Sequence, residues 1–146
     1  MKKVLIGIGA IIILAIAYYL ISPIFNVVEL DESSPVSQTI LFQGNFQPSE
    51  HEVSGKAVLI EDDNKKILRF ENFETINGPD LHIYLSSDLE AKDYVDLGGI
   101  KATKGNVNYE VSSDINLEKY NKVLVWCEPF KVLFSYAELK SAATGI

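Results

Sequence analysis

Residues 123–134, Val-Leu-Val-Trp-Cys-Glu-Pro-Phe-Lys-Val-Leu-Phe, contain the single tryptophan, Trp126, and the single cysteine, Cys127, of a 146-residue chain. Two apolar runs flank Glu128-Pro129, and both are rich in the β-branched and aromatic residues that favour strands. Pro129 has no N–H to donate to a sheet, so we expect a bend, bulge or edge there. Both faces of the run 123–127 are apolar, which predicts a central strand covered on both sides.

From Ile40 onward, short apolar runs alternate with turn residues about every ten positions, a spacing typical of an all-β sandwich or barrel. We therefore predict an all-β fold, a single antiparallel β-sandwich or barrel-like domain that follows one N-terminal transmembrane helix. A single C-terminal helical turn is compatible with residues 136–141. The expected strands are 40–46, 54–61, 67–73, 81–86, 94–97, 107–111, 122–127 and 131–134.

Turns and alternation support this reading. Leu81, Ile83 and Leu85 fall on one face of their strand, as do the odd positions of 107–111. Residues 61–65 read as a charged hairpin tip. Asn77-Gly78-Pro79-Asp80 reads as a tight turn, in which Gly78 supplies a positive φ and Pro79 stiffens the chain before the next strand.

The N-terminus carries a second strong signal. Lys2 and Lys3 precede residues 4–21, which are all aliphatic, aromatic, Gly or Ala; as a helix these span about 27 Å, close to the thickness of a bilayer core. The two lysines favour a cytoplasmic N-terminus and an exported remainder. A cleaved signal peptide is the alternative, because Ala15-Ile16-Ala17 has the form that a peptidase needs. The uncleaved anchor is favoured, since the apolar run continues past Ala17.

These patterns divide the chain into an anchor (1–21), a tether (22–39) and a β domain (40–141). Pro, Ser and acidic residues in 22–39 indicate a tether rather than a packed element. The part after the anchor holds all 20 acidic and 11 of the 13 basic residues, a net charge of −9. Such a surface repels phosphate backbones and argues against a nucleic-acid partner.

Cys127 is the leading candidate for chemistry, because a thiolate is the chain's strongest nucleophile and softest ligand. The competing reading is a buried, inert core cysteine; a third is a disulfide between two chains. His51 and His82 are the only histidines, and their spacing from Cys127 matches no metal-ligand motif, so we predict no metal site. Phosphate-binding glycine loops, Gly-x-Ser-x-Gly and Cys-x-x-Cys are absent from the sequence. A stand-alone enzyme is therefore not favoured.

Several short motifs, taken in order, resemble the DM-thirteen domain, also called the electron-transfer DM domain. The resemblance covers residues 41–140, and Asn-Gly-Pro-Asp-Leu and Trp-Cys are its most specific parts. The motifs are Gly44-Asn45-Phe46, His51-x-x-Ser54-Gly55, Leu68-Arg69-Phe70-Glu71-Asn72-Phe73, Asn77-Gly78-Pro79-Asp80-Leu81-His82-Ile83-Tyr84-Leu85, Gly105-Asn106-Val107-Asn108-Tyr109, Tyr120-x-x-Val123, Trp126-Cys127-x-x-Phe130-x-Val132-x-Phe134 and Ala137-x-Leu139.

The resemblance implies a β-rich domain outside the cytoplasm that takes part in redox chemistry or electron transfer through Cys127. It further implies supporting roles for Trp126, His51 and the turn Asn77-Gly78-Pro79-Asp80. Because no DOMON or cytochrome segment accompanies the domain, the electron donor is expected to be a separate redox protein; no cofactor is indicated. The expected location is the cell membrane, with a single pass through residues 4–21. The alternative function is a non-enzymatic binding or cell-envelope structural module with Cys127 in its core.

Overall fold

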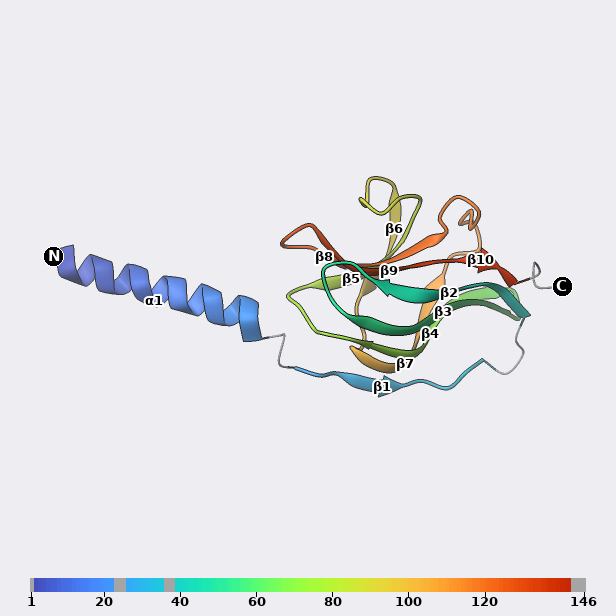
Figure 1. The fold of residues 1–146 in the computed structure, drawn as a ribbon, viewed down its shortest axis with the longest axis horizontal. Coiled ribbons are helices and arrows are strands. Elements are labelled where there is room, and N and C mark those ends of the chain that lie inside the picture. Colours follow the sequence, from blue (N-terminus) through green and yellow to red (C-terminus); the bar gives the residue numbers. More distant parts are fainter. Residues whose placement is uncertain (1, 23–25, 36–38, 143–146) are drawn as a thin grey trace.

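The computed structural model describes residues 2–22, 26–35 and 39–142, and it shows one helix followed by a predominantly β domain (Figure 1). Helix α1 spans Lys2–Ile21 and projects from one end of the domain. The strands are β1 (Glu29–Asp31), β2 (Thr39–Pro48), β3 (Val53–Asp62), β4 (Lys65–Thr75), β5 (Leu81–Ser86), β6 (Tyr94–Gly99), β7 (Lys104–Val111), β8 (Lys122–Cys127), β9 (Val132–Glu138) and β10 (Lys140–Ser141).

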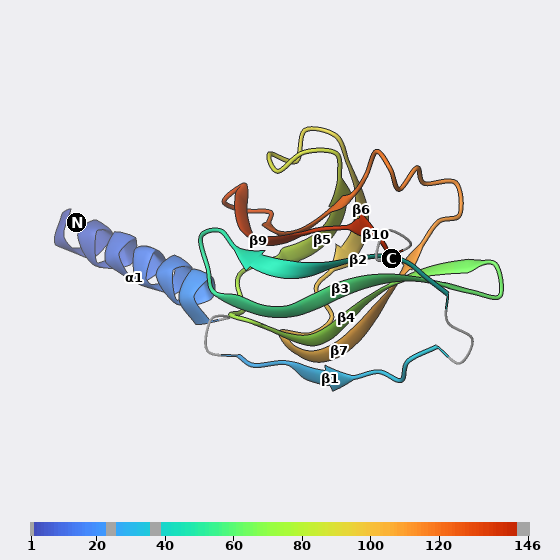
Figure 2. The ribbon, with the colours of Figure 1, turned by 45° about the vertical axis from the view of Figure 1, so that its right-hand side comes forward.

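The strands form one curled sheet in the order β1-β7-β4-β3-β2-β9-β8-β5-β6, with β10 paired to β2. Strand β2 belongs to both halves of the sandwich, because its first part pairs with β3 and its last residues, Phe46 to Pro48, pair with β9. Figure 2 shows the two halves lying over one another. The predicted sandwich is thus confirmed. Its pairing is mixed rather than purely antiparallel, since β1 and β7 run parallel.

Strand β8 lies between β5 and β9 and is buried on both faces, as its sequence predicts. Val123, Val125 and Cys127 point into the main core between the layers. Leu124 and Trp126 point the other way, into a smaller cluster with Tyr84. The predicted inward faces of β5 and β7 are also confirmed, because Leu81, Ile83 and Leu85, and Val107, Tyr109 and Val111, belong to the main core.

The expectation that residues 22–39 contain no packed element is wrong for β1. The backbone of Val28 bonds to Thr103, and Glu32 N donates to Asn106 O at 2.8 Å. Arg69, which is 5% exposed, donates to the carbonyl oxygens of Glu32 and Ser33. These bonds hold the segment on the free edge of β7, a long-range pairing that local composition does not reveal. Residues 23–25 and 36–38 of the expected tether lie outside the described residues.

Residues 136–141 do not form the helical turn with which their sequence is compatible, because β9 continues to Glu138 and β10 follows. Ala137 and Leu139 are buried in the main core, while Tyr136 packs on the smaller cluster. This alternation has the period of a strand. Strand β9 begins at Val132, one residue later than expected, because Lys131 adopts a positive φ of 52° in the turn after β8.

Helix α1 is long and apolar enough to cross a membrane, and none of its described residues is buried against the domain. An N-terminal signal sequence can also be this apolar and meet the same length criterion. The helix therefore supports a candidate membrane span, in agreement with the sequence.

Two glycines with the same backbone requirement allow a test of the packing of β1. Gly98 and Gly105 have φ values of 104° and 116°; a Cβ on Gly98 meets no atom within 4 Å, whereas one on Gly105 lies 2.1 Å from Leu30 O. Gly98→Ala should lower the free energy of unfolding by about 1–2 kcal/mol through backbone strain alone. Gly105→Ala should lower the free energy of unfolding by at least about 1 kcal/mol more than Gly98→Ala does, because it also displaces β1.

Urea unfolding of the full chain in detergent, followed by Trp126 fluorescence, measures both changes. Equal costs for the two variants would show that β1 does not press on Gly105.

Candidate functional site

Cys127 ends β8 with its side chain in the main core, and it is 0% exposed. Its Sγ donates to Pro79 O at 3.3 Å. Burial raises the pKa of the thiol; a hydrogen bond from the Phe130 backbone lowers it, and the negative charge of Asp80 raises it further. The balance favours the neutral thiol, which is a weak nucleophile and a weak metal ligand.

The Asn77-Gly78-Pro79-Asp80 turn contacts this thiol through Pro79 O. Asn77 Oδ1 accepts from Gly78 N at 2.9 Å, and Asn77 Nδ2 donates to Asn26 O at 3.1 Å. Glu128 N donates to Asp80 O at 3.1 Å, so the turn is also tied to the residue that follows Cys127. The turn thus joins three segments: the chain before β1, the start of β5 and the end of β8.

The predicted turn is present, but the reason given for its glycine is wrong. The positive φ falls on Asp80, at 51°, and not on Gly78. Gly78 is needed for space, because a Cβ there would lie 2.7 Å from Cζ of Phe134. Only the tertiary structure brings that ring, from β9, against the turn.

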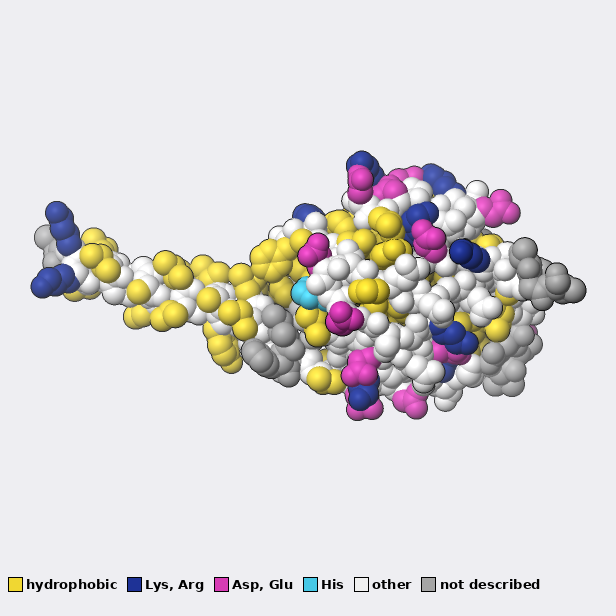
Figure 3. All heavy atoms as spheres, viewed as in Figure 1, with side chains coloured by type: hydrophobic (Ala, Val, Ile, Leu, Met, Phe, Trp, Pro, Cys, Tyr) yellow, Lys and Arg dark blue, Asp and Glu magenta, His cyan; other side chains and the backbone are white. Residues whose placement is uncertain are grey.

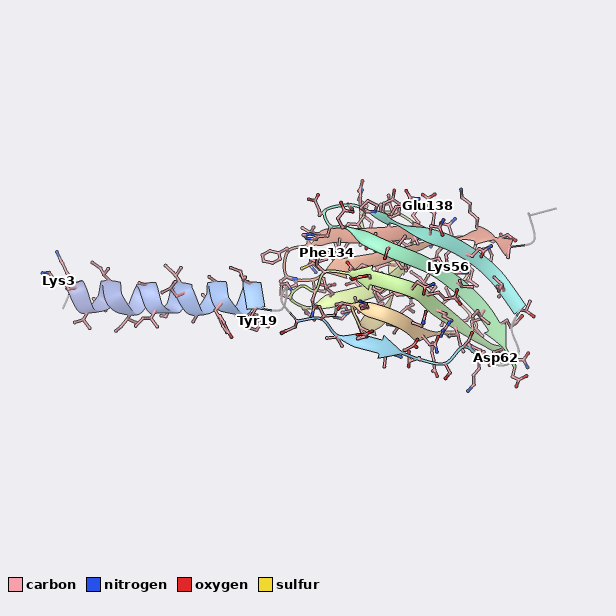
Figure 4. The ribbon with its side chains drawn as sticks, turned by 60° about the horizontal axis from the view of Figure 1, so that its bottom comes forward. Lys3, Tyr19, Lys56, Asp62, Phe134 and Glu138 are labelled. Atoms are coloured by element: carbon pink, nitrogen blue, oxygen red, sulfur yellow. The ribbon has the colours of Figure 1, made fainter. Side chains whose placement is uncertain are left out.

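His51 lies beside the same ring. The centroids of the His51 and Phe134 rings are 4.1 Å apart, and His51 N donates to Phe134 O at 3.2 Å. Figure 4 shows Phe134 at the end of the sandwich that faces Tyr19 of α1, whereas Asp62 lies at the opposite end. His51, Gly78 and Pro79 therefore share one end of the domain with Cys127 beneath them.

A pocket of about 440 Å³ opens at this end. Its lining is mainly apolar and includes Phe130, Phe134, Pro79 and Ile76, together with Leu20 of α1; His51 is one of its polar lining residues. Phe130 and Phe134 were not singled out as site residues from the sequence. Their regular spacing after Trp-Cys was visible, but only the β8–β9 turn places them on one cavity.

Trp126 does not join this site, although it precedes Cys127 in the chain. Neighbouring residues of a strand point to opposite faces, and Trp126 packs on the outer cluster, its ring stacked at 6.3 Å on Tyr84. A register shift between Val125 and Trp126 accompanies this placement. Trp126 acts as packing for β8 rather than as a neighbour of the thiol.

His82 lies between two carboxylates: its Nδ1 is 2.9 Å from Asp96 Oδ2 and its Nε2 is 3.3 Å from Asp80 Oδ1. The side chain of Asp80 therefore faces His82 rather than Cys127. Within residues 2–22, 26–35 and 39–142, no three His, Cys, Asp or Glu side chains are grouped so that they could hold a metal ion.

Together, the fold and the site define a class: a small β-sandwich that follows an apolar helix and has a buried cysteine under a Gly-Pro turn. A family model described as electron transfer DM13 matches residues 45–139. The chain belongs to this family. Searches of curated proteins and of solved structures found no match.

The raised pKa of Cys127 predicts a pH-dependent contribution to stability. Above the ordinary pKa of 9.0 the unfolded thiol loses its proton while the folded one keeps it. The unfolded state then binds fewer protons, so the free energy of unfolding falls as the pH rises. This contribution is fully present below pH 9.0 and is lost above it.

Urea unfolding of the wild type and of Cys127→Ala, from about pH 8 to about pH 10, measures this effect. We expect the stability advantage of the wild type to shrink with rising pH. Burial raises the pKa of Tyr109 to about 12. Because Tyr109 is present in both proteins, its contribution to the pH dependence cancels in the difference between their free energies of unfolding. A constant difference would contradict a raised thiol pKa.

Proposed function

We propose that this chain is a single-pass membrane protein whose DM13 domain takes part in electron transfer outside the cytoplasm. Membership of the electron transfer DM13 family supports the activity. The apolar helix α1, preceded by Lys2 and Lys3, supports the anchor and its orientation.

The observation that carries the proposal is the contact between Cys127 and the 77–80 turn. The thiol donates to Pro79 O at 3.3 Å, so the two most specific motifs of the sequence meet at one point. Pro79 lines the same pocket as Leu20 of α1, so that point lies at the end of the domain next to the helix. A site there is close to the membrane in which α1 is proposed to lie.

The burial of Cys127 restricts how its sulfur takes part. Direct contact with the thiol requires a local opening of the structure, because Cys127 is 0% exposed, and the 77–80 turn is the surface segment to which its sulfur is bonded. The turn is held by the bonds from Asn77 to Asn26 and from Glu128 to Asp80. We propose that the redox partner is a separate protein that docks at this end and opens the turn.

A second candidate function is a non-enzymatic binding module in which Cys127 only fills the core. The 0% exposure of the cysteine and its raised pKa favour this candidate. A protonated thiol enclosed by apolar side chains behaves as a small hydrophobic residue.

The proposed location is tested with a protease added to intact cells that express the full chain with a C-terminal epitope tag. We expect the tag to be removed without lysis, while an N-terminal tag survives until the membrane is opened. Survival of the C-terminal tag in intact cells, with loss after lysis, would place the domain in the cytoplasm.

Substitutions in strand β8 distinguish electron transfer through Cys127 from the binding-module function. We expect Cys127→Ser to abolish the chain's contribution to electron transport in host membranes, because it removes the sulfur. Val125→Ala is the matched control, since Val125 is equally buried on the same face of β8. It should lower stability by about 1–3 kcal/mol and leave electron transport intact at equal protein level.

If Cys127→Ser retains full electron transport at equal protein level, Cys127 is core packing and the binding module is the better function.

A further inference from the structure

The pocket at the helix-facing end combines features that suit a specific kind of ligand. Its volume of about 440 Å³ falls within the range of about 300 to 1,000 Å³ that is usual for small-molecule sites. Phe134 forms part of its wall and Phe130, 53% exposed, stands at its rim. Two aromatic rings and an aliphatic wall suit a flat, apolar ring.

The polar side of the pocket offers a hydrogen-bond donor. The His51 ring packs on Phe134, and its nitrogens form no hydrogen bond with any residue of the described chain. A neutral imidazole carries one N–H that is free to donate. A ligand with a carbonyl oxygen at its edge fits this donor.

Charge limits the ligand further. Glu50 is the charged residue of the lining. Asp80 and Glu128 lie on the adjoining turns, and Lys131 is already paired with Glu128. The surroundings are therefore negative and disfavour a carboxylate or a phosphate head group. A neutral head group is favoured.

The pocket also lies next to the helix. Leu20 of α1 contributes to the lining, and Asn26 O accepts a hydrogen bond from Asn77 of the pocket loop. Five residues from Ile21 to Asn26 span at most about 18 Å. With α1 in a bilayer, the pocket mouth is within reach of a ligand whose tail stays in the membrane. Figure 3 shows hydrophobic side chains continuing from α1 onto this end of the domain.

We propose that this pocket binds the ring of a membrane quinone, with the isoprenoid tail in the bilayer and a ring carbonyl accepting from His51. A quinone ring is flat and neutral and carries carbonyl oxygens, as the lining requires. This inference rests on the proposed membrane location and electron transfer, and it names the carrier with which the domain works. Pro79 links the two sites, since it lines the pocket and its carbonyl oxygen accepts the Cys127 thiol.

The test is a titration of the full chain in detergent micelles with decylubiquinone, followed through the amide NMR signals of His51, Asn77 and Gly78. We expect saturable shifts. His51→Leu and Phe130→Ala should each weaken binding by about 3- to 10-fold, through the lost hydrogen bond and the lost ring contact. The matched controls are His82→Leu, at the half-buried second histidine, and Ile40→Ala, at an exposed apolar residue. Neither residue lines the pocket, so each should change the affinity less than about twofold.

Decanol is the competitor that distinguishes binding of a quinone ring from binding of an alkyl chain. We expect it not to displace decylubiquinone at equal concentration. Absence of saturable shifts, equal displacement by decanol, or equal weakening by the control variants would overturn the proposal. Unchanged amide signals near Asp62, at the far end of the sandwich, show that each variant is folded. The titration needs neither a host membrane nor electron transport, so its failure is distinct from failure of the proposed function.

Discussion

The burial of β8 on both faces is the constraint on which the rest of the structure depends. A strand covered on both sides sends alternate side chains into two separate apolar clusters. Here Val123, Val125 and Cys127 enter the main core, and Leu124 and Trp126 enter the outer one. Strands β5 and β9 are held in place on either side of it. Because Cys127 is the last inward residue, its thiol lies where the core meets the 77–80 turn.

The same turn serves the core and the surface at once. On the inner side of the turn, Pro79 O accepts a hydrogen bond from the Cys127 thiol. The outer side of the turn forms part of the pocket beside Phe134. Gly78 keeps the turn close to that ring, since any Cβ would strike it. We therefore expect a structural change on one side of the turn to shift the other side, because both sides belong to one short loop. This coupling gives a buried cysteine a physical connection to the outside without exposure.

Sequence reasoning succeeded where the signal was local. The alternation in 81–85, 107–111 and 123–127 correctly predicted which residues face the core, and the order of motifs identified the family. It failed where distant segments meet. The pairing of β1 with β7 depends on Arg69 and Asn106, far along the chain. The space needed at Gly78 is set by Phe134, and the partners of His82 come from the 77–80 turn and from β6. The family resemblance implied a supporting role for Trp126 next to Cys127, but the two residues point to opposite faces of β8 and enter different clusters.

The pairing of residues 26–33 with the edge of β7 changes how the domain is connected to the helix. A loose tether would let the domain tumble, and each encounter with a partner would then require the loss of that rotational freedom. The bonds from Val28 to Thr103 and from Arg69 to Glu32 instead hold this part of the chain on the domain itself. Asn26 O also accepts from Asn77, so the connection between α1 and the domain is no longer than the five residues from Ile21 to Asn26, which span at most about 18 Å. With α1 in a bilayer, the domain would stay within that distance of the membrane and meet its partners there by lateral diffusion.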